Sequence, residues 1–131
     1  MSKKILIIED DPGTTRFLVY TLEQQGYKVL SVADGLEGLK KAQDEHPDLI
    51  ILDVMLPGMD GYEVCHRLRQ KSETLTVPVL MVSGRARQDD KNIGIRMGAD
   101  IYLSKPVDPE TILAKVEALL AGVDKIVNVE S

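Results

Sequence analysis

Short apolar runs alternate with stretches of helical spacing along this chain, and that alternation restricts the possible folds more than any other feature. The runs are rich in Ile, Leu and Val, and runs this short are typical of buried strands. They predict strands at Lys4–Ile8, Lys28–Val32, Asp48–Leu52, Val79–Val82 and Asp100–Leu103. Strands that alternate with helices build βαβ units, hence a parallel sheet with helices on both faces. We therefore expect a doubly wound α/β domain.

Helices are predicted between the strands and after the last one. Four are expected from Asp11-Pro12 to Gly26, from about Gly35 to His46, around Val64, Cys65 and Leu68, and from Asp108 to Gly122. The last is the best defined, because Asp108 is a good N-cap, Pro109 occupies the first turn and Gly122 follows the final apolar residue.

The helix expected at 86–97 is the weakest of the five. Its apolar face consists only of Ala86, Ile93 and Met97, and Gly94 in its interior costs about 1 kcal/mol relative to Ala. Two interpretations are open. The segment is either an exposed surface helix or an element of low stability that shifts when a ligand binds.

Size and charge exclude several classes of function. A chain of 131 residues is one domain, long enough to bury a core. The net charge of -5 argues against a broad nucleic-acid-binding surface, and no apolar run approaches the ~20 residues that span a bilayer. The single Cys65 excludes an internal disulfide, and we expect it to be a small buried apolar residue on a helix.

The polar residues of interest follow the predicted strands. Because the carboxyl ends of parallel strands lie at one edge of the sheet, where open α/β sheets bind ligands, these residues should converge. They are Glu9, Asp10 and Asp11 after the first strand, Asp53 after the third, Ser83 and Gly84 at the end of the fourth, and Lys105 with Pro106 after the fifth. Of the three consecutive acids, Asp11 is the expected cap of the next helix.

This set suits phosphoryl transfer assisted by a hard metal ion. Two or three carboxylates with backbone oxygens and waters make the octahedral oxygen site that Mg²⁺ prefers. A carboxylate beside the metal is a nucleophile toward phosphorus and gives an aspartyl-phosphate. Lys105 would add a positive charge, and the Ser83 hydroxyl would add a hydrogen-bond donor.

With these junctions in view, the chain resembles the receiver domain of two-component response regulators from Lys3 to Ala121. The resemblance implies a flavodoxin-like fold, a five-stranded parallel sheet of order 2-1-3-4-5 flanked by five helices. We expect the domain at 1–122, with 123–131 as a tail or the start of a linker. The stretches that carry the resemblance are Ile7 to Asp11, Asp48 to Asp53 with Met55 to Gly61, Val79 to Gly84, and Gly98 to Asp100 with Lys105 and Pro106.

The resemblance also implies roles for the acids. By position, Asp53 is similar to the phosphoryl acceptor of the family and Asp10 to its direct metal ligand. Glu9 would hold the metal through water, and the backbone carbonyl of Met55 would complete the set.

The remaining roles concern the cation and the switch. Lys105 would pair with Asp53 and then with the phosphoryl group, across a cis Lys105-Pro106 bond. Ser83 matches the switch hydroxyl, and Tyr102 matches the aromatic residue that turns inward as that hydroxyl moves. Ordinary packing at a strand end remains the alternative for Tyr102.

Three residues depart from DNA-binding relatives in this family. Ile101 stands where those relatives have a second Asp, Val107 where a Phe often follows Lys-Pro, and Lys115 where they often carry Arg. These changes weaken the expectation of their charged dimer contact, and Ile101 suggests a different partner surface. Arg85 and Met55 flank the phosphorylation site, and we predict that they tune the aspartyl-phosphate lifetime by shaping water access.

Other classes of protein fit the residues less well. A phosphatase of the haloacid-dehalogenase type has a second acid two residues after its nucleophile, where this chain has Met55. A flavodoxin needs a phosphate loop where Glu9, Asp10 and Asp11 would repel phosphate, and the Gly-x-Gly-x-x-Gly pattern of dinucleotide sites is missing. A receiver that only binds proteins, without phosphorylation, stays open as an alternative.

The sequence therefore predicts a cytoplasmic receiver domain, a signalling switch rather than an enzyme. A histidine kinase or phosphotransfer protein would phosphorylate Asp53 with Mg²⁺, and the domain would catalyse its own phosphorylation and dephosphorylation. The switch would act on a surface around the fourth helix, fifth strand and fifth helix, which a downstream effector domain or protein would bind. We expect no direct binding of this segment to nucleic acid or membrane.

Overall fold

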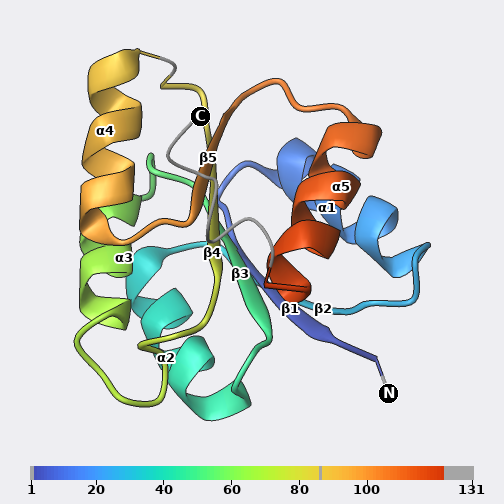
Figure 1. The fold of residues 1–131 in the computed structure, drawn as a ribbon, viewed down its shortest axis with the longest axis horizontal. Coiled ribbons are helices and arrows are strands. Elements are labelled where there is room, and N and C mark those ends of the chain that lie inside the picture. The colour runs from blue at the N-terminus through green and yellow to red at the C-terminus, as the bar shows by residue number, and fades with distance from the viewer. Residues whose placement is uncertain (1, 86, 123–131) are drawn as a thin grey trace.

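The computed structural model describes residues 2–85 and 87–122, and within them a five-stranded parallel sheet lies between two layers of helices (Figure 1). The strands are β1 (Lys4–Ile8), β2 (Lys28–Val32), β3 (Leu49–Leu52), β4 (Val79–Ser83) and β5 (Ile101–Ser104). The helices are α1 (Pro12–Glu23), α2 (Gly35–Glu45), α3 (Gly61–Leu68), α4 (Gln88–Met97) and α5 (Pro109–Leu120). The strand order β2-β1-β3-β4-β5 confirms the predicted topology.

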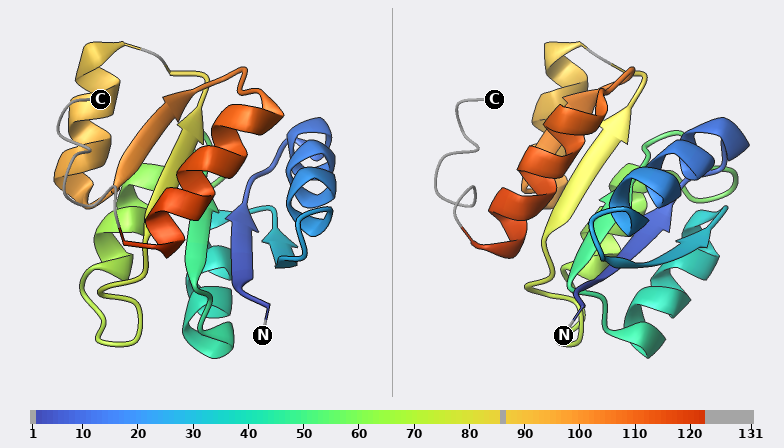
Figure 2. Two further views of the ribbon diagram at one scale, coloured as in Figure 1. Left: turned by 45° about the vertical axis from the view of Figure 1, so that its right-hand side comes forward. Right: turned by 90° about the vertical axis from the view of Figure 1, so that its right-hand side faces the viewer.

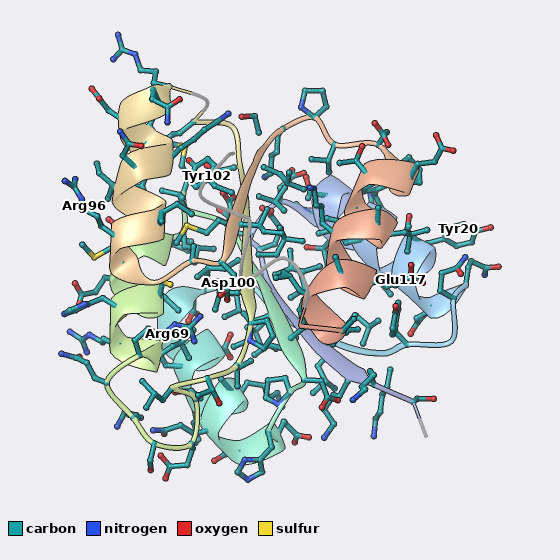
Figure 3. The ribbon with its side chains drawn as sticks, in the orientation of Figure 1. Tyr20, Arg69, Arg96, Asp100, Tyr102 and Glu117 are labelled. Carbon is teal, nitrogen blue, oxygen red and sulfur yellow. The ribbon has the colours of Figure 1, made fainter. Side chains whose placement is uncertain are left out.

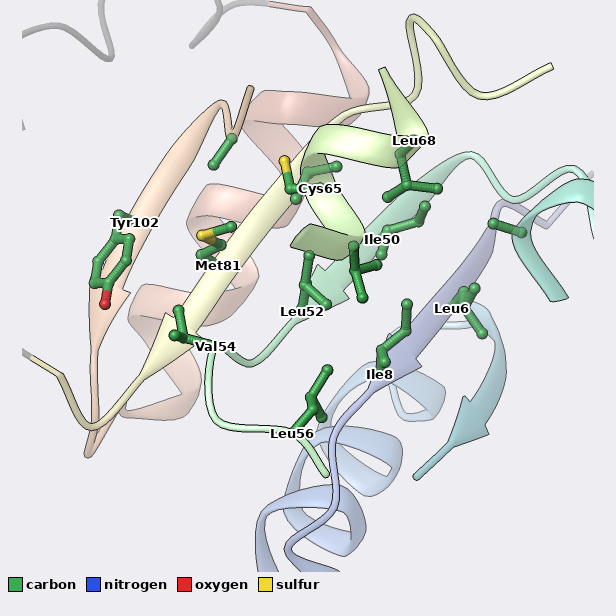
Figure 4. Close-up of a cluster of buried hydrophobic side chains, with 14 residues drawn as sticks. Leu6, Ile8, Ile50, Leu52, Val54, Leu56, Cys65, Leu68, Met81 and Tyr102 are labelled. Carbon is green, nitrogen blue, oxygen red and sulfur yellow. The ribbon is translucent and has the colours of Figure 1, made fainter. Parts of the chain in front are cut away.

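Side chains of the strands alternate between two apolar cores. Leu6 and Ile8 of β1 pack with α2 and α3 on one face, whereas Ile5 and Ile7 pack with α1 and α5 on the other. Figures 1 and 2 show the helix layers on opposite sides of the sheet, and Figure 4 shows the first core. Because helices cover both faces, β3 and β4 are buried along their whole length, and β1 is buried from Ile5 onward, instead of alternating between buried and exposed residues.

Aspartates begin four of the helices described. The side chains of Asp11, Asp34, Asp60 and Asp108 each accept a hydrogen bond from the backbone N–H three residues later, at 2.7 to 3.0 Å. Asp11 and Asp108 are therefore the caps that the sequence predicted. The cap of α3 is Asp60, so Asp53 is not committed to starting a helix.

Two predicted strands begin one residue later than expected. Asp48 and Asp100 lie just before β3 and β5, where their carboxylates accept the backbone N–H groups of Lys4 (2.7 Å) and Val79 (2.8 Å). The fourth strand ends one residue later than expected, because Ser83 of β4 pairs with Ser104 of β5.

The weak helix differs most from its prediction. It begins at Gln88 instead of Ala86, which lies outside the described residues, as does the expected tail at 123–131. Ile95 and Met97 pack against the core, so Met97 of the predicted apolar face is confirmed and Ile95, which the prediction did not include, belongs to that face.

Gly94 is the buried residue of α4, and a close approach explains the glycine. A Cβ atom at this position would lie 2.7 Å from the Tyr102 ring and 2.9 Å from the Met81 sulfur. Any larger residue would therefore hold α4 away from β4 and β5.

A single arginine joins the loops at the far end of the sheet. The Arg69 guanidinium donates to the Gly98 carbonyl (2.9 and 3.1 Å), the Val77 carbonyl (2.7 Å) and the Asp100 carboxylate (3.2 Å). It also reaches two carbonyls at 74–75, each at 3.2 Å. Figure 3 labels Arg69 at α3 and Asp100 before β5.

Two expectations about single residues are settled by burial. Cys65 is fully buried on α3, as predicted. Ile101 is 1% exposed and packs in the core beneath α1 and α5, so its own side chain is not part of a partner surface. Because side chains alternate between the two faces of a strand, the Ile101 side chain of β5 points toward this core.

Among the described residues no helix combines the length and the apolar character needed to cross a membrane.

Candidate functional site

The site forms where β1 and β3 end side by side. Ile8 is paired with Leu52, and the Asp53 N–H donates to the Ile8 carbonyl at 3.0 Å. The residues that follow these strands therefore face each other. One carboxylate oxygen from each of Glu9, Asp10 and Asp53 lies within 4.8 Å of the others, which confirms the predicted convergence of these acids.

Burial and like charge make this acidic cluster a candidate site for a cation. Glu9 is 4% and Asp53 is 5% exposed, whereas Asp10 is open to solvent. Buried carboxylates this close repel one another unless a cation or proton intervenes. Their hard oxygen atoms, with one exposed ligand that leaves room for water, fit the chemistry of Mg²⁺.

The cation that this structure places among the acids is Lys105. Its Nζ lies 2.9 Å from Glu9 Oε1 and 3.3 Å from Asp53 Oδ2, and the Lys105-Pro106 bond is cis, as the resemblance implied. Burial raises the pKa of the Glu9 carboxyl and the charge of Asp53 adds to this, against the lowering effect of Lys105. Burial disfavours the charged form of Lys105, but its two carboxylate partners outweigh burial and raise its pKa.

Asp11 supports the cluster from outside it. Its Oδ2 accepts from Thr14 N–H (2.8 Å) and from the Thr14 hydroxyl (2.7 Å), and these bonds lower the pKa of Asp11. Its own N–H donates to Glu9 Oε2 at 3.0 Å. Asp11 thus caps α1 and orients Glu9. The prediction that Asp11 is the helix cap among the three consecutive acids is therefore confirmed.

Gly61 lets the loop after β3 fold tightly over Asp53. Its N–H donates to the Val54 carbonyl at 2.8 Å, and a Cβ atom on it would strike the Asp53 carbonyl. The Met55 N–H donates to Asp53 Oδ1 at 3.2 Å, which fixes the carboxylate from the loop side.

Ser83 lies fully buried at the end of β4. Its Oγ accepts from the Arg85 N–H at 3.2 Å, an arrangement that leaves the hydroxyl proton available to donate. Its carbonyl accepts from the Lys105 N–H at 2.8 Å, so the ends of β4 and β5 are joined beside the cluster. Gly84 next to it has open space on its Cβ side.

Tyr102 points inward between β5 and α4. It is 3% exposed, and its hydroxyl donates to the Arg85 carbonyl at 2.8 Å (Figure 3). The ring packs in the core while the hydroxyl contacts the loop that follows Ser83. The two interpretations of Tyr102, packing and connection to the switch hydroxyl, are therefore compatible.

Arg85 follows Ser83, and Met55 follows Asp53, by two residues each. Both are exposed and line a pocket of about 410 Å³ together with Tyr62. Tyr62 was not predicted to contribute, yet its hydroxyl donates to the Asp90 carbonyl at 3.0 Å. An aromatic residue in the first turn of α3 is indistinguishable in sequence from ordinary core packing, so no signal could have identified this bond.

Comparisons with known proteins agree with this geometry. A family model described as the response regulator receiver domain matches residues 5–117. The alkaline phosphatase synthesis transcriptional regulatory protein PhoP of Bacillus subtilis is 48% identical, over 92% of this chain and 49% of its own. The chain spans about half the length of the transcriptional regulators that it matches.

Solved structures show the same likeness. A putative response regulator from Chloroflexus aurantiacus superposes with a TM-score of 0.89 at 37% identity, covering 92% of this chain and 99% of its own. The receiver domain of the sensor histidine kinase PA1611 from Pseudomonas aeruginosa has a TM-score of 0.81 at 28% identity, covering 95% and 98%. That structure holds a magnesium ion in its active site cleft.

Proposed function

The chain belongs to the response regulator receiver domain family, and on that premise we propose that Asp53 is its phosphoryl acceptor. The observation that carries the proposal is the cluster of Glu9, Asp10 and Asp53, with carboxylate oxygens within 4.8 Å of one another and the Lys105 ammonium 3.3 Å from Asp53. Asp53 is the buried acid after β3 that both contacts this cation and shares the cluster with the two acids after β1.

The proposed donor is a phosphohistidine of a histidine kinase or phosphotransfer protein. A carboxylate oxygen of Asp53 attacks phosphorus, the P–N bond breaks, and its electron pair returns to the imidazole, which takes up a proton. A mixed anhydride forms on Asp53. Water later attacks the same phosphorus, releases inorganic phosphate and restores the carboxylate, so the domain catalyses its own reset.

The chain's own residues lower the barrier by position and charge. The Lys105 ammonium offsets charge on the transferred oxygens, and the buried Ser83 hydroxyl donates to one of them. Glu9, Asp10, Asp53 and the Met55 carbonyl would hold Mg²⁺. When bound, the metal would neutralise the remaining charge on the phosphoryl group.

The output follows from the position of Ser83 and Tyr102. Phosphorylation would bias α4, β5 and α5 between two arrangements, and an effector domain or protein would bind one of them. We place the receiver unit at 1–122 and its site of action in the cytoplasm, as a signalling switch rather than an enzyme with an external substrate.

Mass spectrometry after incubation with acetyl phosphate and Mg²⁺ tests the proposal. The wild-type chain should gain the mass of one phosphoryl group, and hydroxylamine should remove it because acyl phosphates are labile to this nucleophile. Asp53→Asn should gain nothing, whereas Asp60→Asn, which alters a helix cap, should still be modified. A hydroxylamine-labile adduct on Asp53→Asn would refute the assignment, and an unmodified wild-type chain would favour a receiver that only binds proteins.

A further inference from the structure

A pocket of about 510 Å³ lies beside the acidic cluster, between the start of α1 and the loop that joins β5 to α5. The half-buried Phe17 and Val107 and the exposed Pro106 give it apolar walls, whereas Asp11 and Lys105 supply its charges. We call it the α1 pocket. Because Lys105 also contacts the proposed phosphoryl acceptor, the pocket adjoins the place where the phosphoryl group is transferred.

The two charges of the α1 pocket are not equally available to a ligand. The Lys105 ammonium lies 2.9 Å from Glu9 Oε1 and 3.3 Å from Asp53 Oδ2, so carboxylates already hold it. Asp11 is exposed, and the N–H and hydroxyl of Thr14 both bond to its Oδ2. Among the described residues nothing donates to Asp11 Oδ1. The pocket therefore presents a negative charge with one oxygen free to accept a hydrogen bond.

The start of α1 does little to attract an anion into this pocket. A helix N-terminus binds anions through its unbonded N–H groups. Here Pro12 has no N–H, and the Thr14 N–H already donates to Asp11 Oδ2 at 2.8 Å. A ligand that is apolar over most of its surface and brings an N–H or a positive charge is therefore favoured over an anion.

The imidazole of a phosphohistidine has this chemistry. Its ring faces are largely apolar, and the ring nitrogen that is not bonded to phosphorus carries an N–H when it is protonated. Asp53 is 5% exposed, so it attacks phosphorus from inside the molecule. In-line transfer then places the leaving group toward solvent, the side on which Asp11 and Pro106 of the pocket are exposed.

Given that Asp53 is the phosphoryl acceptor, we propose that the α1 pocket receives the imidazole ring of the donor and that Asp11 is a specificity-determining residue, which accepts a hydrogen bond from that ring. As the Asp53 oxygen bonds to phosphorus, the P–N bond breaks and its electron pair stays on nitrogen. The proton that the imidazole has taken up is held on the ring nitrogen facing Asp11, so the ring leaves neutral. Acetyl phosphate gains no such bond, and its leaving group is an anion that Asp11 repels.

The experiment compares wild type, Asp11→Asn and Asp60→Asn. Asn caps helices as well as Asp does, so Asp11→Asn removes the charge but keeps the cap and the backbone N–H that bonds to Glu9. Asp60→Asn is the matched control, since it makes the same change at the cap of α3, in the pocket lined by Met55 and Arg85. Each protein reacts with phosphoimidazole or acetyl phosphate below saturation, with Mg²⁺ at one pH, and intact-mass spectrometry follows the adduct.

The measured quantity is the rate constant with phosphoimidazole divided by the rate constant with acetyl phosphate. Asp11→Asn should lower this ratio about 2- to 10-fold, because one partly solvated charge acts with opposite sign on the two donors. The ratio for Asp60→Asn should match that of wild type. In about 0.5 M salt the effect of Asp11→Asn should shrink, since screening weakens the interactions of exposed charges.

An unchanged or higher ratio in Asp11→Asn would overturn the proposal. Equal changes with both donors leave the ratio unchanged and would mean that Asp11 acts only by orienting Glu9. An equal fall in Asp60→Asn would also overturn it, because net charge and not this pocket would then be responsible, as would an effect that salt leaves undiminished. If neither donor phosphorylates Asp53 in the wild-type chain, the acceptor assignment itself fails, which is a separate result.

Discussion

Replacing Arg69 by Met removes the guanidinium and keeps much of the side chain's aliphatic length. The guanidinium is 19% exposed and bonds to the carbonyls of Gly98 and Val77 and to the Asp100 carboxylate, itself 16% exposed. Of the two further acceptors, the carbonyl of the buried Thr74 keeps its bond from the Val77 N–H at 3.2 Å, and the carbonyl of the exposed Leu75 regains water when the arginine is lost.

The expected loss of stability follows from three acceptors: the Gly98 and Val77 carbonyls, which lose the bonds from the arginine, and the Asp100 carboxylate, which keeps the Val79 N–H but loses its cation. A buried group left without its partner costs about 1–3 kcal/mol, and bonds from a charged donor lie toward the upper end of that range. Because solvent reaches the edge of this cluster, we take about 1 kcal/mol for each acceptor. Arg69→Met should therefore lower the free energy of unfolding by about 3 kcal/mol, measured by urea denaturation followed by circular dichroism.

Two variants on the same helix control this measurement. Arg67→Met breaks an exposed pair with Glu63 (2.8 Å), in which the side chains are 49% and 47% exposed, and should cost no more than about 0.5 kcal/mol. Arg69→Lys keeps the charge but lacks the planar fork that reaches several acceptors, so it should lose most of the same stability. If Arg69→Met were no more costly than Arg67→Met, the idea that one arginine joins these loops would be wrong.

Three further predictions concern other residues. Gly94→Ala should lower stability by about 1 kcal/mol in thermal unfolding, although helix propensity alone predicts a gain, because its Cβ would lie 2.7 Å from the Tyr102 ring; a higher Tm would contradict this. Burial raises the pKa of Cys65 to about 11, so the thiol should react with Ellman's reagent at pH 8 only in denaturant. Met55→Ala and Arg85→Ala each remove a side chain from the pocket that the two residues line, and each should shorten the phosphoryl lifetime; an unchanged half-life would refute the predicted control of water access.

Sequence reasoning succeeded where the signal is local or follows from strand position. The alternating runs predicted the elements, and Asp11 and Asp108 could be recognised as caps because an N-cap bonds only three residues ahead. The convergence of Glu9 with Asp53 was also accessible, because residues that end neighbouring parallel strands must meet.

The rest depends on contacts that no local pattern encodes. The Tyr62–Asp90 bond joins residues 28 apart, and the Arg69–Asp100 pair joins residues 31 apart. Both arise only after α3 and α4 have packed side by side. Ile101 shows the related difficulty for a strand residue, since a shift of one position decides whether its side chain is buried or exposed.

The Lys105 ammonium and a metal ion would compete for the same carboxylates of the acidic cluster. The ammonium lies 2.9 Å from Glu9 and 3.3 Å from Asp53 and offsets one of their two negative charges, so a divalent cation held by these acids would compete with a tethered monovalent one instead of entering an open cluster. The displaced ammonium stays linked to β5 and remains within reach of Asp53. We therefore expect the Lys105 ammonium, once it leaves Glu9, to pair with the negative charge that forms on Asp53 during phosphoryl transfer. Metal uptake would then also place Lys105 where the phosphoryl group needs a cation.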